Sequence, residues 1–188
     1  VYLSEKIGYW RYILIDRHLK ANPDNSFAPL FDFFEPWCQD ENRHGDIFNM
    51  LIRCWPGLRR GLRGKLLSRF FLWSVFLTHS LTVCERGNFY RILGMDPKVF
   101  DAEVMRQTNR TARRAFPAVF DLETSAYISL RDQIVATFRD LKQASGLRRL
   151  GLTLRFGALL LRQFCQPMVA TGMEQAGPAD ARLQQVVA

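Results

Sequence analysis

The sequence predicts an all-α protein, and three observations carry this prediction. Apolar residues recur at steps of three and four along most of the chain, which is the period of an amphipathic helix. No stretch alternates apolar and polar residues for long enough to indicate a sheet. Hydrophobic residues make up 48% of the 188 residues, whereas Gly and Pro number only 12 and 8, so turn formers are too few for a β-sandwich.

The first two expected helices follow from this spacing and from the residues that interrupt it. One helix covers about residues 3–19 and ends at the Asn22-Pro23-Asp24-Asn25 break. A second covers about residues 28–54, with a kink at Pro36 left open.

The next helices are bounded in the same way. A third covers about residues 62–85, and its uncharged part, Phe70 to Cys84, is short for a membrane span and indicates a buried core helix. A short helical turn near Phe89-Tyr90 stops at Gly94-Met95-Asp96-Pro97. Two more helices are expected over about residues 98–115 and 125–144.

The end of the chain differs in kind from residues 1–145, which we expect to form one compact domain. Residues 146–170 are rich in Leu, and Arg148, Arg155 and Arg162 lie at steps of seven on one side of a helix. Because an arginine in the middle makes a membrane crossing costly, this basic amphipathic helix is expected either to lie on an anionic membrane surface or to pack on the domain. Residues 171–188 are expected to be disordered.

Charge and cysteine usage narrow the function classes. Lys and Arg number 26 against 18 Asp and Glu, for a formal charge of +8, which suits nucleic acid, an anionic membrane or an acidic partner. No nucleic-acid-binding motif accompanies the charge, so we expect no nucleic-acid partner. The four cysteines form no C-x-x-C pair and are interpreted as reduced thiols in a cytosolic compartment.

One dense cluster of ligand-type side chains stands out inside the second helix. Glu41 and His44 are three residues apart, so a carboxylate and an imidazole share one helix face and could hold a metal ion. Asp40 precedes the pair and could orient the imidazole as an outer partner. Glu5, on the preceding helix, could reach Glu41 if the two helices form an antiparallel hairpin. Glu-x-x-His alone is a weak motif, and a solvated helix face is the alternative interpretation.

Other polar residues are better explained by structure. His18 and His79 are interpreted as a helix-end and a core histidine, and Glu35, nearly opposite Glu41 on its helix, as surface charge. The segment Gly57 to Lys65 is not a phosphate loop, because Leu66 stands where a Mg²⁺-binding Ser or Thr is required.

Several strings in the first two thirds of the chain resemble one enzyme family, the oxygen-dependent magnesium-protoporphyrin IX monomethyl ester oxidative cyclases. The resemblance covers about residues 1–125. It is most specific in Ser4-Glu5-Lys6-Ile7-Gly8-Tyr9-Trp10-Arg11-Tyr12-Ile13 and Trp37-Cys38-Gln39-Asp40-Glu41-Asn42-Arg43-His44-Gly45-Asp46, and continues in Arg69-Phe70-Phe71-Leu72, Gly94-Met95-Asp96 and Arg114-Ala115-Phe116-Pro117.

This resemblance implies a ferritin-like helical bundle with two non-haem iron ions. The implied reaction uses O₂ and electrons from NADPH or ferredoxin to close the fifth ring of the magnesium porphyrin, which gives divinyl protochlorophyllide in chlorophyll and bacteriochlorophyll synthesis. Glu5, Glu41 and His44 would be iron ligands, with Asp40 beside them. The implied partners are the Mg-porphyrin, O₂, an electron-donor protein and an accessory subunit. The implied location is peripheral, on the cytoplasmic side of a photosynthetic membrane.

The chain departs from this family in lacking a second Glu-x-x-His. We therefore expect a carboxy-terminal portion that is inactive alone, and that is either a fragment of a longer protein or a chain that needs a separate amino-terminal half. Two alternatives remain: another di-iron oxidase, such as an acyl-carrier-protein desaturase, and a non-catalytic helical scaffold at a membrane.

Overall fold

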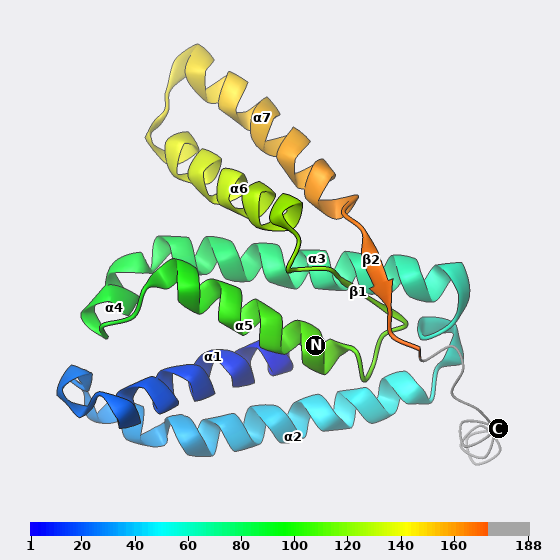
Figure 1. Cartoon of the computed structure of the whole chain (residues 1–188), viewed down its shortest axis with the longest axis horizontal. Coiled ribbons are helices and arrows are strands. Elements are labelled where there is room, and N and C mark those ends of the chain that lie inside the picture. The colour runs from blue at the N-terminus through cyan, green and yellow to red at the C-terminus, as the bar shows by residue number, and fades with distance from the viewer. Residues whose placement is uncertain (173–188) are drawn as a thin grey trace.

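The structure is a computed structural model that describes residues 1–172, and their architecture is helical, as predicted (Figure 1). The described chain contains seven α-helices and one pair of short strands. In order they are α1 (Tyr2–Ala21), α2 (Phe34–Arg53), α3 (Gly61–Glu85), α4 (Gly87–Ile92), α5 (Pro97–Ala112), β1 (Ala118–Phe120), α6 (Ser125–Gln143), α7 (Gly146–Phe164) and β2 (Met168–Ala170). Short 3-10 turns lie at Pro23–Asn25, Pro29–Phe33 and Pro56–Leu58.

The start of α5 shows how the local sequence sets these boundaries. The Asp96 carboxylate accepts hydrogen bonds from the backbone N–H groups of Lys98 and Val99 at 2.8 and 2.9 Å, and Pro97 occupies a first-turn position that has no intrahelical donor to lose. Gly94, just before the cap, has a φ of 73°, a conformation that suits glycine. The Gly94-Met95-Asp96-Pro97 segment, which the sequence analysis interpreted as the end of one helix, therefore also caps the beginning of α5.

The second expected helix was wrong at its beginning. Residues 29–33 form a 3-10 turn, and α2 begins only at Phe34. Pro36 consequently lies in the first turn of α2, where its missing N–H breaks no intrahelical bond, so it need not kink the helix.

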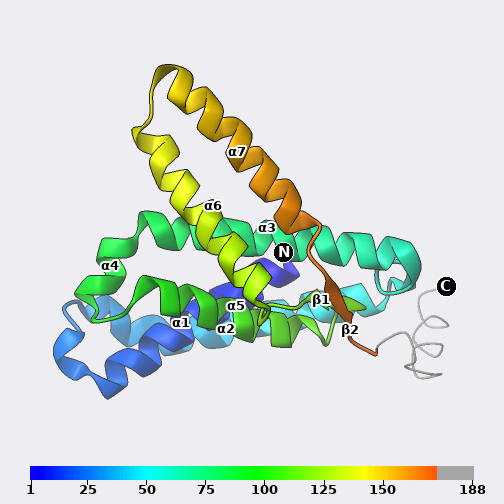
Figure 2. The ribbon, with the colours of Figure 1, turned by 45° about the horizontal axis from the view of Figure 1, so that its top comes forward.

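The helices form two parts that share α3. The α1–α2 hairpin lies against α3 and α5, and the α6–α7 hairpin stands at an angle to them (Figures 1 and 2). A large core between α1, α3 and α5 includes Leu72, Phe76 and Val104, which are fully buried. A smaller cluster of Leu130, Ile134 and Leu159 joins α6 to α7.

The all-α prediction is confirmed, and the one addition to it within the described residues is a small strand pair in which β1 and β2 run antiparallel with Ala118 opposite Ala170. Each strand has three residues, and all of β1 is buried, so neither could show a period-two pattern. The helix expected over residues 146–170 accordingly ends at Phe164. Thr171, placed in the expected disordered tail, donates its backbone N–H to Pro117 and its hydroxyl to Phe116. Residues 173–188 of that tail lie outside the described residues.

The interpretation of α3 as a core helix is supported along one face. Leu72, Phe76, His79, Ser80 and Val83 are buried. By length and composition α3 could also cross a membrane, but core helices of soluble proteins meet the same two criteria. In α3, 33% of the apolar window is buried.

Candidate metal centre

A buried lysine holds α1 and α2 in register. Lys6 is 3% exposed, and its ammonium donates to the Asn42 carbonyl, the Asn42 side chain and the Asp46 carboxylate at 2.9, 2.8 and 2.7 Å. The Lys6 side chain lies against Gly45, where an added Cβ would come within 2.5 Å of it. Because Lys6 follows Glu5 and Gly45 follows His44, this contact fixes the ligand-type residues of the two helices opposite each other.

The structure brings Glu5, Glu41 and His44 together, as the hairpin predicts. One ligand atom from each lies within 4.8 Å of the other two, and His44 Nδ1 is 3.5 Å from a Glu5 carboxylate oxygen. The Glu41 carboxylate lies 3.6–3.7 Å from the position of a Cβ on Gly8, so the face of α1 is flat where Glu41 meets it. Glu5 is largely shielded, whereas the His44 side chain is 60% exposed.

The electrostatics of this cluster favour a cation. Burial, together with the hydrogen bond and charge of Glu5, raises the pKa of Glu41 from its ordinary 4.5 to about 7. Two carboxylates and an imidazole are donors that iron and similar divalent ions accept. A bound cation would replace the shared proton, so the residues present fit one metal ion.

The raised pKa of Glu41 leads to a prediction for the metal-free protein. A carboxyl group whose folded pKa is raised binds its proton more tightly when folded, so stability falls as pH rises from 4.5 through 7. Glu41→Gln should therefore be more stable than the parent at pH 8, by about 1 kcal/mol after allowance for solvent screening. The difference should vanish below pH 4.5 when unfolding is followed with a chelator present. A difference that does not change with pH would contradict this origin.

The donor set is too small for two ions within residues 1–172. Among these residues, Glu5, Glu41 and His44 form the only group of three or more His, Cys, Asp or Glu side chains that could hold a metal ion, and the whole sequence has no second Glu-x-x-His. Asp40, predicted to orient His44, instead accepts a 3.3 Å hydrogen bond from Arg43 on the exposed surface. Its orienting role stays a prediction.

Two functional candidates were missed by the sequence analysis. Arg11 and His79 line a cavity of about 450 Å³ together with Glu5, Glu41 and His44. The spacing Glu5, Gly8, Arg11 could have placed the arginine on the ligand face of α1. His79 was interpreted only as a core histidine, because it lies in the uncharged segment Phe70 to Cys84. The remaining assignments agree with the contacts: His18 bonds the Leu93 carbonyl, and Glu35 pairs with Lys20.

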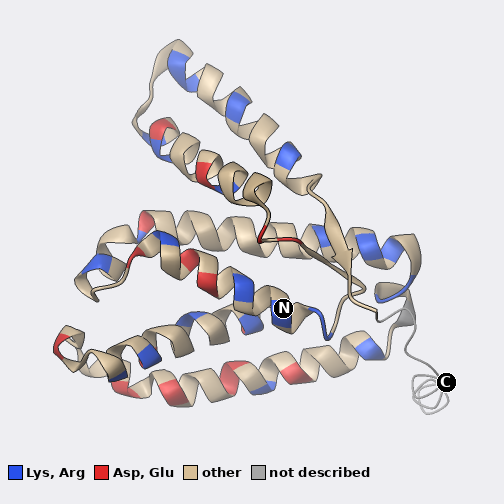
Figure 3. Ribbon diagram, viewed as in Figure 1, with Lys and Arg blue, Asp and Glu red and all other residues tan. Residues whose placement is uncertain are grey.

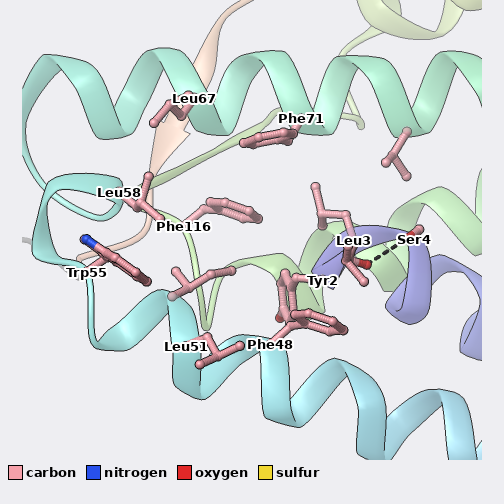
Figure 4. A pocket seen from close by; sticks show the side chains of 13 residues that line it. Tyr2, Leu3, Ser4, Phe48, Leu51, Trp55, Leu58, Leu67, Phe71 and Phe116 are labelled. Atoms are coloured by element: carbon pink, nitrogen blue, oxygen red, sulfur yellow. Dashed lines mark hydrogen bonds between the residues drawn. The ribbon is translucent and has the colours of Figure 1, made fainter. Parts of the chain in front are cut away.

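An apolar cavity adjoins this space. It measures about 300 Å³, shares Ser4 and Val75 with the polar cavity, and is lined mainly by aromatic and aliphatic side chains of α1, α2 and α3 (Figure 4). Tyr2, Phe48 and Phe116 are among the residues that surround it. A polar ligand cluster and an apolar space thus meet at the first turn of α1.

Comparison with known proteins supports both the fold and the resemblance. The rubrerythrin family matches residues 1–52, the segment that contains the ligand cluster, which supports the ferritin-like assignment. A magnesium-protoporphyrin IX monomethyl ester oxidative cyclase of Prochlorococcus marinus is 60% identical over 94% of this chain and 51% of its own length. Enzymes of the same name are 48% identical in Thermosynechococcus vestitus and 43% identical in Gossypium hirsutum.

These relatives confirm the resemblance that the sequence motifs indicate. The chain spans about half the length of the curated relatives it matches. No solved structure matches it.

Proposed function

We propose that this chain, homologous over 94% of its length to about half of a magnesium-protoporphyrin IX monomethyl ester oxidative cyclase, is the carboxy-terminal portion of such an enzyme. The observation that carries the proposal is that the residues matching the family's motif, Glu5, Glu41 and His44, converge on one point. The missing donors would come from the other half.

In this proposal the chain contributes one side of a two-iron centre. Non-haem iron supplies the activation of O₂ that oxidation of a C–H bond requires and that no side chain provides. Glu5, Glu41 and His44 hold iron, while Lys6 and Gly45 keep the two helices in register. The adjoining apolar cavity has the polarity that the edge of a porphyrin ring requires. Electrons would come from NADPH or ferredoxin through a donor protein, with an accessory subunit as a further partner.

Product analysis tests this function. The chain is combined with the amino-terminal half, the electron-donor protein and the accessory subunit of a relative, and is supplied with iron, O₂, reductant and Mg-protoporphyrin IX monomethyl ester. We expect divinyl protochlorophyllide from the combination and none from either half. Conversion of acyl-carrier-protein substrates instead would establish the desaturase alternative, and no product with a fully loaded iron site would exclude the cyclase reaction.

We also propose that α7 holds the protein on the cytoplasmic surface of a photosynthetic membrane. One face of α7 packs on α6 through Leu159, whereas Leu147, Leu154 and Leu161 are 65–88% exposed. Arg148, Arg155 and Arg162 each follow one of these leucines in the sequence, and α7 carries basic but no acidic residues (Figure 3). Exposed leucines flanked by arginines suit the boundary of an anionic bilayer.

Vesicle binding tests this location. Each arginine near an anionic surface contributes about 1 kcal/mol, so changing Arg148, Arg155 and Arg162 together to Gln should weaken binding to phosphatidylserine vesicles by about 100-fold. The matched control changes the exposed Arg110, Arg113 and Arg114 to Gln and should bind as the parent does. Equal losses in both triple variants would show that net charge, not α7, determines binding. Lipid binding by a protein that takes up no iron with its other half would instead support the non-catalytic scaffold.

A further inference from the structure

Arg11 lines the cavity of Glu5, Glu41 and His44, and its guanidinium is hydrogen-bonded to His79. Its Nη2 group donates a hydrogen bond to His79 Nδ1 at 3.2 Å. An arginine has only donors, so Nδ1 must be the acceptor and the proton of the neutral ring lies on Nε2. Arg11 thereby determines the tautomer of His79, and His79 determines the direction of Arg11.

His79 lies beside a buried charged group, although its Nε2 atom makes no hydrogen bond within the described residues. His79 is 1% exposed, and its Nε2 atom faces the Asp101 carboxylate at 3.6 Å. Burial, with the charge of Arg11, lowers the pKa of His79 to about 3, so the ring is neutral at pH 7. Asp101 accepts the Ser80 hydroxyl at 2.9 and 3.0 Å, and Arg131 of α6 lies 3.7 Å from it. Side chains of α1, α3, α5 and α6 thus determine where one guanidinium points.

The hydrogen bond to His79 involves only the Nη2 group of Arg11. Arg11 lines the cavity that contains Glu41 and His44. Within the described residues its Nε atom is buried and has no hydrogen-bond partner, and no carboxylate within them lies in ion-pair distance of it. A buried donor without an acceptor costs free energy unless a ligand supplies one. The guanidinium thus lines the cavity beside Glu41 and His44 with a positive charge that no carboxylate of residues 1–172 pairs at ion-pair distance.

We propose that Arg11 binds a carboxyl-derived oxygen of the substrate beside the metal cluster, and that His79 and Asp101 are positioning residues for it. This inference rests on the proposed function. A porphyrin monomethyl ester offers two groups with such oxygens, its free propionate carboxylate and its ester carbonyl. Arginine suits either, because its planar donors match carboxylate geometry and its charge persists at every physiological pH. A bound oxygen at this point would hold one edge of the macrocycle near the cluster.

Binding without iron or turnover tests the role of Arg11. Mg-protoporphyrin IX monomethyl ester and the corresponding dimethyl ester are titrated against the full 188-residue chain, with quenching of tryptophan fluorescence as the signal. Because a hydrogen bond to a charged group is lost, Arg11→Gln should weaken binding of the monoester by about tenfold or more, and Arg11→Lys by less. Arg17→Gln, an exposed change of equal charge on the same helix, is the matched control and should leave binding unchanged.

The two esters identify the oxygen. If only the monoester binds more weakly to Arg11→Gln than to the parent, Arg11 recognises the free carboxylate. If both esters bind more weakly to the variant, Arg11 recognises the ester carbonyl. Equal binding of both esters to the parent and Arg11→Gln overturns the inference and leaves the proposed function intact. Failure of the parent to bind either ester contradicts the proposed substrate, and the inference fails with it.

A double-mutant cycle tests the positioning role. His79→Phe keeps a buried ring but offers Arg11 no acceptor, so it should weaken monoester binding in the parent and have no further effect in the Arg11→Gln background. His79→Gln restores an acceptor and should rescue part of the loss. A purely structural histidine would show the same loss in both backgrounds, and that result overturns the positioning role.

Discussion

Replacing Glu41 with alanine should lower the affinity of the chain for ferrous iron by more than about 100-fold, since loss even of a residue that only orients a ligand costs 10–100-fold. A Glu41 carboxylate oxygen lies within 4.8 Å of a ligand atom of Glu5 and of one of His44, and this carboxylate supplies both a donor atom and a negative charge. Anaerobic titration with Fe²⁺ measures the change.

Loss of folding cannot imitate this result. Removing Glu41 also removes the cost of burying its charge and its repulsion with Glu5, both of which oppose folding of the metal-free protein as the pH rises above 4.5. The variant should therefore unfold no earlier than the parent at pH 8 while failing to hold iron. Glu35→Ala is the matched control, because this glutamate lies on the same helix and pairs with Lys20 on the surface. It should bind iron as the parent does.

Stoichiometry extends the test to the divided centre. Two irons per complex are expected only when the amino-terminal half of a relative is present, and Glu41→Ala should remove them. Two irons held by this chain alone would show that the proposed ligand set is incomplete. Asp40→Ala should have the smaller effect of an outer partner if Asp40 turns toward His44 in the complete site.

The parts of this fold that depend on local sequence were predictable. The third helix, expected over residues 62–85, is α3 at Gly61–Glu85, because apolar spacing and the flanking breaks are local signals. Glu41 and His44 were found in the same way, through a three-residue step on one helix. Glu5 required one further assumption, an antiparallel hairpin, and the Lys6–Gly45 contact explains why the hairpin has that register.

The parts that depend on distant pairing were not predictable. Strand β1 meets β2 across about fifty residues, with Ala118 opposite Ala170, and three-residue strands carry no periodic signal. The contact of Arg11 with His79 joins residues 68 positions apart. An arginine on an amphipathic helix and a histidine in an apolar run are each ordinary on their own, and only the packing of α1 on α3 makes them a unit.

That packing leads to the prediction with the largest effect on stability. Phe76 is fully buried on the inner face of α3, one turn before His79, whereas Phe70 on the same helix is 49% exposed. Phe76→Ala should cost about 3–5 kcal/mol, through lost burial and the cavity left behind. Phe70→Ala should cost less than about 1 kcal/mol. Urea denaturation of both variants in detergent-free buffer measures the difference, with equal slopes showing that the denatured states match.

Comparing Phe76→Ala with Phe70→Ala also tests whether α3 is a core helix or a membrane-spanning helix. Its length and composition would allow it to cross a membrane, but a core helix requires the two residues to differ as their burial does. Small and equal costs would contradict the core assignment, and with it the support that α3 gives to His79. A large loss of stability in Phe76→Ala alone would show that the buried face of α3 unfolds as one unit. His79, which contacts Arg11, shares this face with Leu72 and Phe76.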